Sequence, residues 1–323
     1  MSADVQVGLD GWLYLAGGSN EVLRFYNEAD FFEAAGTAWI EQLRIREMQA
    51  RERGIHYRHM IVPDKLTIYS EFYPNSLNYP ENVPSRKLAR LLTEQPDADR
   101  LAPVLVDVRA ALLAAKSTSP KLFSKTDSHW TFEGCWAAFL ALCRDVGATV
   151  DYAILNAPEV AGELFLDLGS KLNPPVAETF VSKLFSRGAE IAYTNSLVEY
   201  KEREDAHNAA GLHVGSHIVL RNNATATDPR TVVLFGDSYA EYRMHQLTGL
   251  LAETFANTHF IWNHNIDWEY VDSVKPHVVV TELAERFHTM VPTDDLCIDQ
   301  FAQDRLDQYL AISNSLEVDP EAA

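Results

Sequence analysis

VVLFGDSYAEYR, residues 232–243, begins like a buried strand and breaks at a glycine. An aspartate and a serine follow, and the apolar pattern over residues 240–256 predicts a helix after them. Gly236 allows a sharp turn without a side-chain clash. In an open α/β sheet, such a turn lies at the carboxyl ends of the strands, where ligands bind. The segment therefore predicts a sheet of this kind with Ser238 at its functional edge.

Four further apolar, β-branched runs repeat this pattern along the chain. Strands that alternate with helical patterns indicate an α/β fold, a doubly wound and mostly parallel sheet with helices on both faces. The expected strands are residues 57–62, 103–108, 231–235, 259–262 and 277–283. Helices are expected over residues 32–53, 132–146, 240–256 and 298–314.

The rhythm of strands and helices stops in residues 150–230. This stretch contains two adjacent prolines and the polar segment RNNATATDPR (221–230). We expect residues 1–323 to form a single domain in which 150–230 is an insertion or cap, with a hairpin around 210–220. A separate small domain is the alternative.

Composition disfavours several classes of partner. The 323 residues include 46 acidic and 27 basic side chains, a net charge of −19. This disfavours nucleic acid, because phosphate binding needs clustered Lys and Arg. No apolar run is long enough to predict a membrane span, and the first residues do not resemble a signal peptide. Three cysteines, an odd number, suit buried thiols in a reducing compartment. The sequence as it stands predicts a cytoplasmic protein, or a periplasmic one if a leader has been removed.

Ser238 is either a nucleophile or the cap of the helix expected after it. At a helix amino terminus, unpaired backbone N–H groups and the positive end of the dipole can stabilise an oxyanion. Serine is also a common helix cap, and the turn alone favours capping. A nucleophilic serine needs a base, so the decision depends on whether the chain supplies a histidine with a carboxylate.

KTDSHWTFEG (125–134) supplies the best candidate for that base. Asp127 and His129 are two residues apart, so in an extended segment they point to the same face. Asp127 would accept a hydrogen bond from Nδ1–H of His129 and leave Nε2 free, as in a Ser-His-Asp triad. An ordinary loop before a helix capped by Thr131 is the alternative. We find no pattern typical of a metal site and expect no metal.

Five short segments, taken in order, resemble the motifs of a known family. They are GLDGWLYL (8–15), VPDKLTIYSEFYP (62–74), TDSHWTFEG (126–134), LFGDSYA (234–240) and VTELAERF (280–287). The family comprises SGNH-hydrolase-like proteins related to bacterial alginate O-acetyltransferases of the AlgJ/AlgX kind. Most SGNH hydrolases place the serine before the histidine motif. Here D-x-H precedes the serine, and this permuted order is similar to that of the acetyltransferase branch.

The resemblance implies an SGNH-hydrolase-like, flavodoxin-like fold with Ser238 as nucleophile, His129 as general base and Asp127 as orienting acid. It implies transfer of an acetyl group through a serine acyl-enzyme to a polysaccharide hydroxyl. The expected partners are a carbohydrate acceptor, an acetyl donor of unknown identity and other proteins of a polysaccharide assembly system. No cofactor is expected.

Three further residues are candidates for the oxyanion hole or the substrate pocket. Lys65 follows the strand 57–62, so it is expected at the same edge as Ser238, either as an oxyanion donor or as a solvated lysine. Tyr239 and Arg243 follow the serine closely and are expected to line the pocket, although Arg243 is equally a surface candidate.

Arg286 is the fourth candidate and follows the last expected strand. It would bind an anionic sugar or pair with Glu282 or Glu285, and we favour the ion pair. Asp237 is interpreted as a structural hydrogen-bond acceptor at the serine turn.

The sequence thus predicts a serine-dependent O-acetyltransferase acting on a carbohydrate. One alternative is a carbohydrate acetyl esterase, which shares the machinery and differs in whether water is excluded. A catalytically silent carbohydrate-binding protein of a polysaccharide assembly system is the other. The complete set of Asp127, His129 and Ser238 argues against a silent protein. We interpret residues 150–230 as the wall on the acceptor side.

Overall fold

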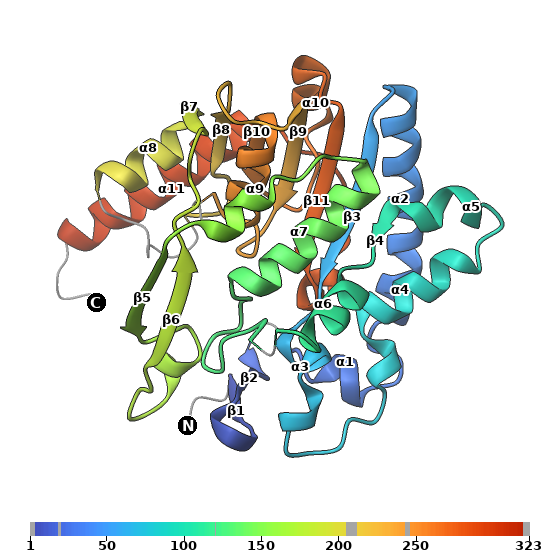
Figure 1. Cartoon of the computed structure of the whole chain (residues 1–323), viewed down its shortest axis with the longest axis vertical. Coiled ribbons are helices and arrows are strands. Elements are labelled where there is room, and N and C mark those ends of the chain that lie inside the picture. Colours follow the sequence, from blue (N-terminus) through green and yellow to red (C-terminus); the bar gives the residue numbers. More distant parts are fainter. Residues whose placement is uncertain (1–3, 19–20, 120, 205–211, 243–245, 319–323) are drawn as a thin grey trace.

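A central sheet organises the molecule (Figure 1). The computed structural model describes residues 4–18, 21–119, 121–204, 212–242 and 246–318. Within these residues, seven strands form the sheet in the order β4-β3-β11-β9-β10-β8-β7. The bounds are β3 (His56–Val62), β4 (Leu105–Val106), β7 (Glu190–Thr194), β8 (His217–Arg221), β9 (Asp228–Gly236), β10 (Phe255–Trp262) and β11 (Val278–Ala284). From β4 to β10 every neighbouring pair is parallel, whereas β8 runs antiparallel to both β10 and β7. The predicted doubly wound, mostly parallel α/β fold is therefore confirmed.

The middle strands are buried because both of their faces are covered. A parallel strand in this position reads as a continuous apolar run instead of alternating with polar residues. The buried runs are Val232, Val233, Leu234 and Phe235 in β9, and Val278, Val279 and Val280 in β11. β11 lies between β3 and β9, so the last of the described strands in chain order is an inner strand of the sheet.

Helices flank this sheet. In Figure 1, α6 and α7 lie in front of the strands, and α2 packs beside β3. The bounds are α1 (Arg24–Asn27), α2 (Glu33–Glu52), α3 (Lys65–Ile68), α4 (Pro84–Thr93), α5 (Ala98–Leu101), α6 (Val108–Lys116), α7 (Phe132–Val146), α8 (Ser196–Arg203), α9 (Leu247–Thr254), α10 (Trp268–Val274) and α11 (Ile298–Val318). None of the described helices is long and apolar enough to cross a membrane.

The helix predicted over 240–256 begins later than expected. Ser238, Tyr239 and Ala240 form a turn, and α9 does not begin until Leu247. Ala240 N donates to Asp237 O at 3.1 Å, and Tyr239 N donates to the Asp237 side chain at 2.9 Å. These two bonds close a turn at residues 237–240 in place of the first turn of the expected helix. Residues 243–245 lie outside the described part of the chain.

The strand predicted over 103–108 is also shorter than expected. β4 holds only Leu105 and Val106. Residues Ala102–Val104 form a 3₁₀ turn around Pro103, which has no N–H to donate to a sheet. On the other side, the Asp107 side chain accepts from Ala110 N and begins α6.

Residues 150–230 contribute both to the central sheet and to a separate hairpin. β5 (Glu159–Leu164) and β6 (Glu178–Lys183) pair antiparallel outside the central sheet. Near the start of the chain, and separate from this hairpin, a short β1 (Val5–Val7) pairs with β2 (Leu13–Leu15). The hairpin predicted around 210–220 lies partly outside the described residues, and β8 pairs with β7 and β10. The division into one domain with an insertion at 150–230 stays a prediction.

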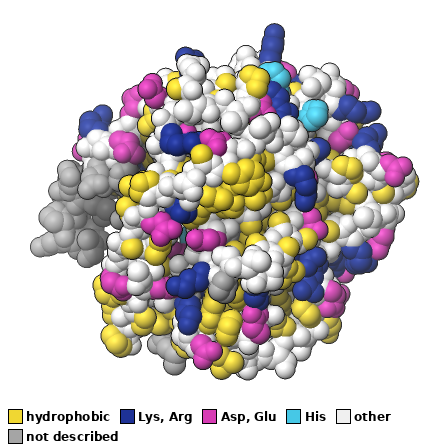
Figure 2. All heavy atoms as spheres, in the orientation of Figure 1, with side chains coloured by type: hydrophobic (Ala, Val, Ile, Leu, Met, Phe, Trp, Pro, Cys, Tyr) yellow, Lys and Arg dark blue, Asp and Glu magenta, His cyan; other side chains and the backbone are white. Residues whose placement is uncertain are grey.

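Charged side chains of both signs are mixed on the surface. On the face shown in Figure 2, Lys and Arg side chains lie scattered among Asp and Glu and do not gather in one patch. This face therefore does not offer the clustered basic surface that nucleic-acid binding requires.

Candidate active site

His129 lies within hydrogen-bonding distance of Ser238 on one side and of Asp127 on the other. Ser238 follows the end of β9, and the loop before α7 supplies the other two residues. His129 Nε2 is 2.8 Å from Ser238 Oγ, and His129 Nδ1 is 2.9 Å from Asp127 Oδ1. Asp127 Oδ1 also accepts from the backbone N of His129 at 3.0 Å. A carboxylate can only accept, so Nδ1 carries the proton and Nε2 is free to accept from the serine hydroxyl.

The charges around His129 favour its protonated form. Burial lowers the pKa of His129, but the hydrogen bond to Asp127 and the charges of Asp127 and Asp167 outweigh burial, so the pKa is raised. Burial raises the pKa of Asp127, but the hydrogen bond and charge of His129 hold that pKa well below its usual range. Asp127 therefore stays ionised and can stabilise an imidazolium.

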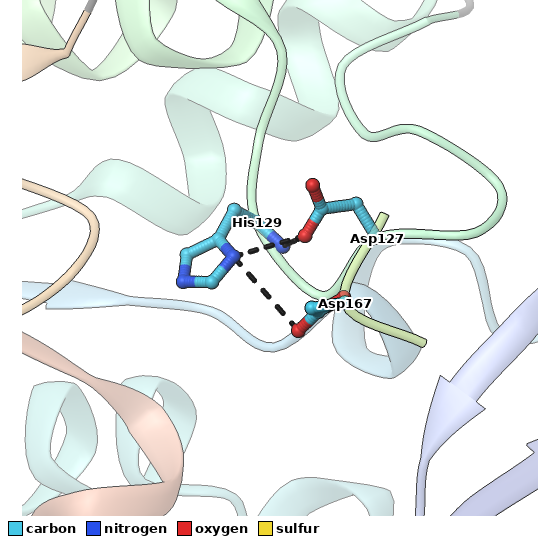
Figure 3. A group of neighbouring side chains, drawn as sticks. All are labelled: Asp127, His129 and Asp167. Carbon is cyan, nitrogen blue, oxygen red and sulfur yellow. Dashed lines mark hydrogen bonds and ion pairs between the residues drawn. The ribbon is translucent and has the colours of Figure 1, made fainter. Parts of the chain in front are cut away.

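Asp167 is a second carboxylate beside this histidine, and no sequence pattern predicts it. Its Oδ2 lies 3.9 Å from His129 Nδ1 (Figure 3). Its Oδ1 accepts from Ser128 N at 2.7 Å, and its Oδ2 accepts from the Ser128 hydroxyl. Asp167 is one of 46 acidic residues and stands in no motif or spacing relation to His129. Only the folded chain brings it close.

The same three side chains have atoms that could hold a cation. One ligand atom each from Asp127, His129 and Asp167 lie within 4.8 Å of one another. A cation bound at His129 Nδ1 would displace the proton that Asp127 accepts. The remaining proton would then sit on Nε2, which could not accept from Ser238. The hydrogen bonds of this group therefore favour an Asp-His pair over a metal site.

Two buried acidic side chains, those of Asp237 and Glu282, accept hydrogen bonds from the backbone of the serine turn. Asp237 Oδ1 accepts from Tyr239 N at 2.9 Å, and Asp237 Oδ2 accepts from Ala284 N at 2.7 Å, so Asp237 is a structural acceptor. A Cβ added at Gly236 would lie 2.9 Å from Glu282 Oε2 and 2.8 Å from the Cβ of Ala240. Glycine is therefore required here by close packing.

The turn geometry changes the expected source of an oxyanion hole. Because α9 begins at Leu247, Ser238 does not stand at a helix amino terminus. The backbone N–H of Ser238 itself has no acceptor within the described residues. That N–H could therefore donate to an oxyanion formed beside the serine hydroxyl.

Lys65 is buried against the loop that carries His129 and donates to its backbone carbonyls. Its Nζ donates to the carbonyl oxygens of Ser124 at 3.0 Å, Lys125 at 2.8 Å and Asp127 at 2.5 Å. These contacts use all three hydrogens of the ammonium group and leave none for an oxyanion. Burial lowers the pKa of Lys65 to about 7, although the charges of nearby carboxylates oppose this.

Tyr239 and Arg286 are buried and contact protein groups. The Tyr239 hydroxyl donates to Ser128 O at 2.6 Å, which joins the serine turn to the histidine loop. Arg286 Nη1 donates to Asp64 Oδ1 at 2.6 Å, and it lies 3.4 Å from the Tyr239 hydroxyl. The favoured ion pair of Arg286 therefore forms, but with Asp64. Arg243 lies outside the described residues.

Loss of the Arg286 side chain should destabilise the fold strongly. Arg286 and Asp64 are 5% and 6% exposed, so Arg286→Met leaves an unpaired carboxylate in the interior. We expect the free energy of unfolding to fall by about 3–5 kcal/mol in urea denaturation. The exposed Arg24, which pairs with Glu21 and Glu28, provides the control, and Arg24→Met should change stability far less. Equal losses in the two variants would contradict the structural role of Arg286.

Comparisons with known proteins agree with the α/β fold. Residues 5–164 match the family model described as SGNH hydrolase-like domain, acetyltransferase AlgX. No curated protein matches the sequence. PatB1 of Bacillus cereus has a similar structure, with a TM-score of 0.60, 14% identity and coverage of 89% of this chain and 97% of that chain. A second PatB1 structure carries a sulfonyl adduct.

The O-acetyltransferase domain of Pseudomonas putida AlgJ is also similar, with a TM-score of 0.57, 17% identity and coverage of 93% of this chain and 99% of that chain. Identities this low establish a shared fold. They do so over most of the chain, whereas the family model covers its first half. The predicted resemblance is thereby confirmed: residues 5–164 match the SGNH hydrolase-like AlgX acetyltransferase family model, and the fold is similar to that of the AlgJ domain.

Proposed function

We propose that this protein is an O-acetyltransferase that moves an acetyl group through an acyl-enzyme on Ser238 to a carbohydrate hydroxyl. The observation that carries the proposal is the continuous hydrogen-bond chain from Asp127 through His129 to Ser238, with distances of 2.9 and 2.8 Å. The match to an acetyltransferase domain family supports an acetyl-transfer reaction. The AlgJ neighbour is named as an O-acetyltransferase domain, which points the same way.

In the first half-reaction, Ser238 Oγ attacks the carbonyl carbon of the acetyl donor. His129 Nε2 takes the hydroxyl proton, and the electron pair of the carbonyl bond moves to oxygen. The Ser238 N–H stabilises this oxyanion, and the Asp127 carboxylate stabilises the imidazolium. The oxyanion then collapses, the bond to the leaving group breaks, and the leaving group takes the proton from Nε2. Ser238 is left as an acetyl ester.

In the second half-reaction, the acceptor hydroxyl attacks the ester carbonyl while His129 takes its proton. The tetrahedral intermediate collapses, Ser238 Oγ leaves, and the same proton returns to it. Attack by water instead would give hydrolysis with the same groups. The acceptor must therefore keep water out while it binds, and we assign this to residues 150–230, whose residue Asp167 contacts the histidine loop.

Intact-mass spectrometry tests this function. Incubation with acetyl-CoA or an activated aryl acetate should add one acetyl group, and peptide mapping should place it on Ser238. A sulfonyl fluoride is a second probe, since PatB1 accepts a sulfonyl adduct. Mass analysis of an added oligosaccharide then separates transfer from hydrolysis. Folded protein that gains no adduct from any of these reagents would favour a silent carbohydrate-binding protein and refute the proposal.

A further inference from the structure

Asp167 faces the histidine of the site but has no part in the mechanism above. It lies between β5 and the 3₁₀ turn Gly169–Lys171. The Ser128 backbone N donates to its Oδ1 at 2.7 Å, and the Ser128 hydroxyl donates to its Oδ2. Oδ2 also lies 3.9 Å from Nδ1 of His129, the nitrogen that donates a hydrogen bond to Asp127 (Figure 3). Two carboxylates from distant parts of the chain therefore approach one imidazole nitrogen.

The backbone around Asp167 is bound firmly to the base loop, which we define as residues 124–129. Leu168 N and Gly169 N both donate to Thr126 O, at 3.1 and 3.0 Å. A Cβ added at Gly169 would meet Val176 O at 2.3 Å and the Thr126 Cβ at 3.1 Å, so the two segments are in close contact. These contacts therefore fix the backbone of Asp167, and with it the origin of its side chain, relative to the base loop.

Glu178, from β6, contributes a second carboxylate to the same loop. Its side chain accepts from Lys125 N at 3.1 Å, from Thr126 N at 2.8 Å and from the Thr126 hydroxyl at 2.9 Å. Glu178 thus binds the start of the base loop, at Lys125 and Thr126, whereas Asp167 binds its end, at Ser128. Of Asp167 and Glu178, the described contacts bring Asp167 to the imidazole, with its Oδ2 3.9 Å from Nδ1.

Ser128 is held on two sides. Asp167 accepts from its N–H and its hydroxyl, and its carbonyl oxygen accepts from the Tyr239 hydroxyl at 2.6 Å. Tyr239 follows Ser238 directly, so this bond ties the base loop to the nucleophile. Because Ser128 stands between Asp127 and His129, any displacement of Ser128 moves both of them.

We propose that Asp167 is a positioning residue of this site, which fixes Ser128 and thereby the Asp127–His129 pair, and which places a second negative charge behind the imidazole. This inference rests on the proposed function, since it assigns how the general base is supported.

The charged groups around His129 set the sign of the electrostatic effect. Burial lowers the pKa of His129, Asp127 and Asp167 raise it, and Arg286 lowers it. Burial, followed by the charge of Asp127, raises the pKa of Asp167 itself. Lys65 is another cation of the described residues near both carboxylates, and the charges of Asp167 and Asp127 raise its pKa against the effect of burial. Removal of the Asp167 charge should therefore lower the pKa of His129.

The test compares Asp167→Asn with two matched variants. Asp167→Asn should lower kcat about 10- to 100-fold with little change in KM, because the base is misplaced while the binding surface is kept. The acid limb of its pH profile should move to lower pH. Ser128→Ala removes the hydroxyl contact but keeps the charge, so kcat should fall less and the limb should stay in place. Ser170→Ala, which removes an exposed hydroxyl bound to the Asp167 carbonyl, should behave as wild type.

A second measurement does not need an acetyl donor. The pKa of His129 can be followed by NMR of histidine-labelled protein, with His129→Gln to assign its signal, so it is readable even if the proposed function fails. A lower pKa in Asp167→Asn than in wild type supports the inference. An unchanged pKa, or a loss of kcat with an unmoved acid limb, overturns it. Should Asp167→Asn not fold, an unchanged kcat in Ser128→Ala overturns it equally.

Discussion

The Ser238→Ala variant is expected to form no acyl-enzyme and to lose about 10⁶-fold in kcat. Alanine has no oxygen to attack the donor, so the covalent route closes. The Ser238 hydroxyl bonds only His129 among the described residues, so its removal should leave the fold intact. Intact mass and the turnover of an aryl acetate measure the two effects.

Ser273→Ala is a suitable control for this variant. Ser273 is exposed on α10 and its hydroxyl bonds the Tyr270 carbonyl, far along the chain from the site. It should acquire the adduct and turn over the donor as the wild type does. An adduct of the same mass on folded Ser238→Ala would show that another residue carries the acetyl group, and the assignment of the nucleophile would be lost.

Asp127→Asn is expected to fold normally and to lose about 10⁴-fold in kcat. The amide carbonyl can still accept from the His129 backbone N, so the local structure should survive. The amide NH₂ can instead donate to Nδ1, which places the remaining ring proton on Nε2. The histidine then cannot accept from Ser238.

The pH profile adds a second readout for the same residue. His129 must be neutral to act as a base, so acylation should rise with pH as the imidazolium loses its proton. Asp127 raises the pKa of His129, so in the wild type this limb should lie above the usual value of about 6.5. Asp127→Asn removes the charge that raises the pKa of His129, so the acid limb of the residual activity should lie at lower pH than in the wild type.

Asp99→Asn, on the exposed surface of α5, is the matched control and should leave both the rate and the limb unchanged. A native rate in folded Asp127→Asn would show that the carboxylate does not orient the histidine. If Asp127→Asn lost activity but the acid limb of its pH profile stayed where it is in the wild type, the carboxylate would act on the geometry of His129 and would not shift its pKa.

The sequence predicts the parts of this protein that depend on local pattern. β9 and β11 were found within three residues of their ends, because buried parallel strands are long apolar runs with few alternatives. Asp127 and His129 were paired by their spacing in the chain. Ser238 was placed with them by the turn after β9 and by the order of the family motifs.

What the sequence could not show depends on contacts between distant segments. The predicted start of α9 is wrong because the side chain and the carbonyl of Asp237, which accept from Tyr239 N and Ala240 N, stabilise a turn that helical periodicity does not reveal. Arg286 was assigned neighbouring glutamates, whereas folding places Asp64 beside it. Asp167 was missed for the same reason, since no local spacing relates it to the histidine.

The position of β11 also matters for biosynthesis. Its backbone hydrogen-bonds to β3 on one side and to β9 on the other, yet it is the last of the described strands to be made. A nascent chain on the ribosome therefore cannot join the early strand that leads to Lys65 to the late strand that leads to Ser238 until Ala284 has emerged. Such distant pairing makes for slow folding. A translation product that ends before β11 would thus hold the imidazole of His129 without its hydroxyl partner in place.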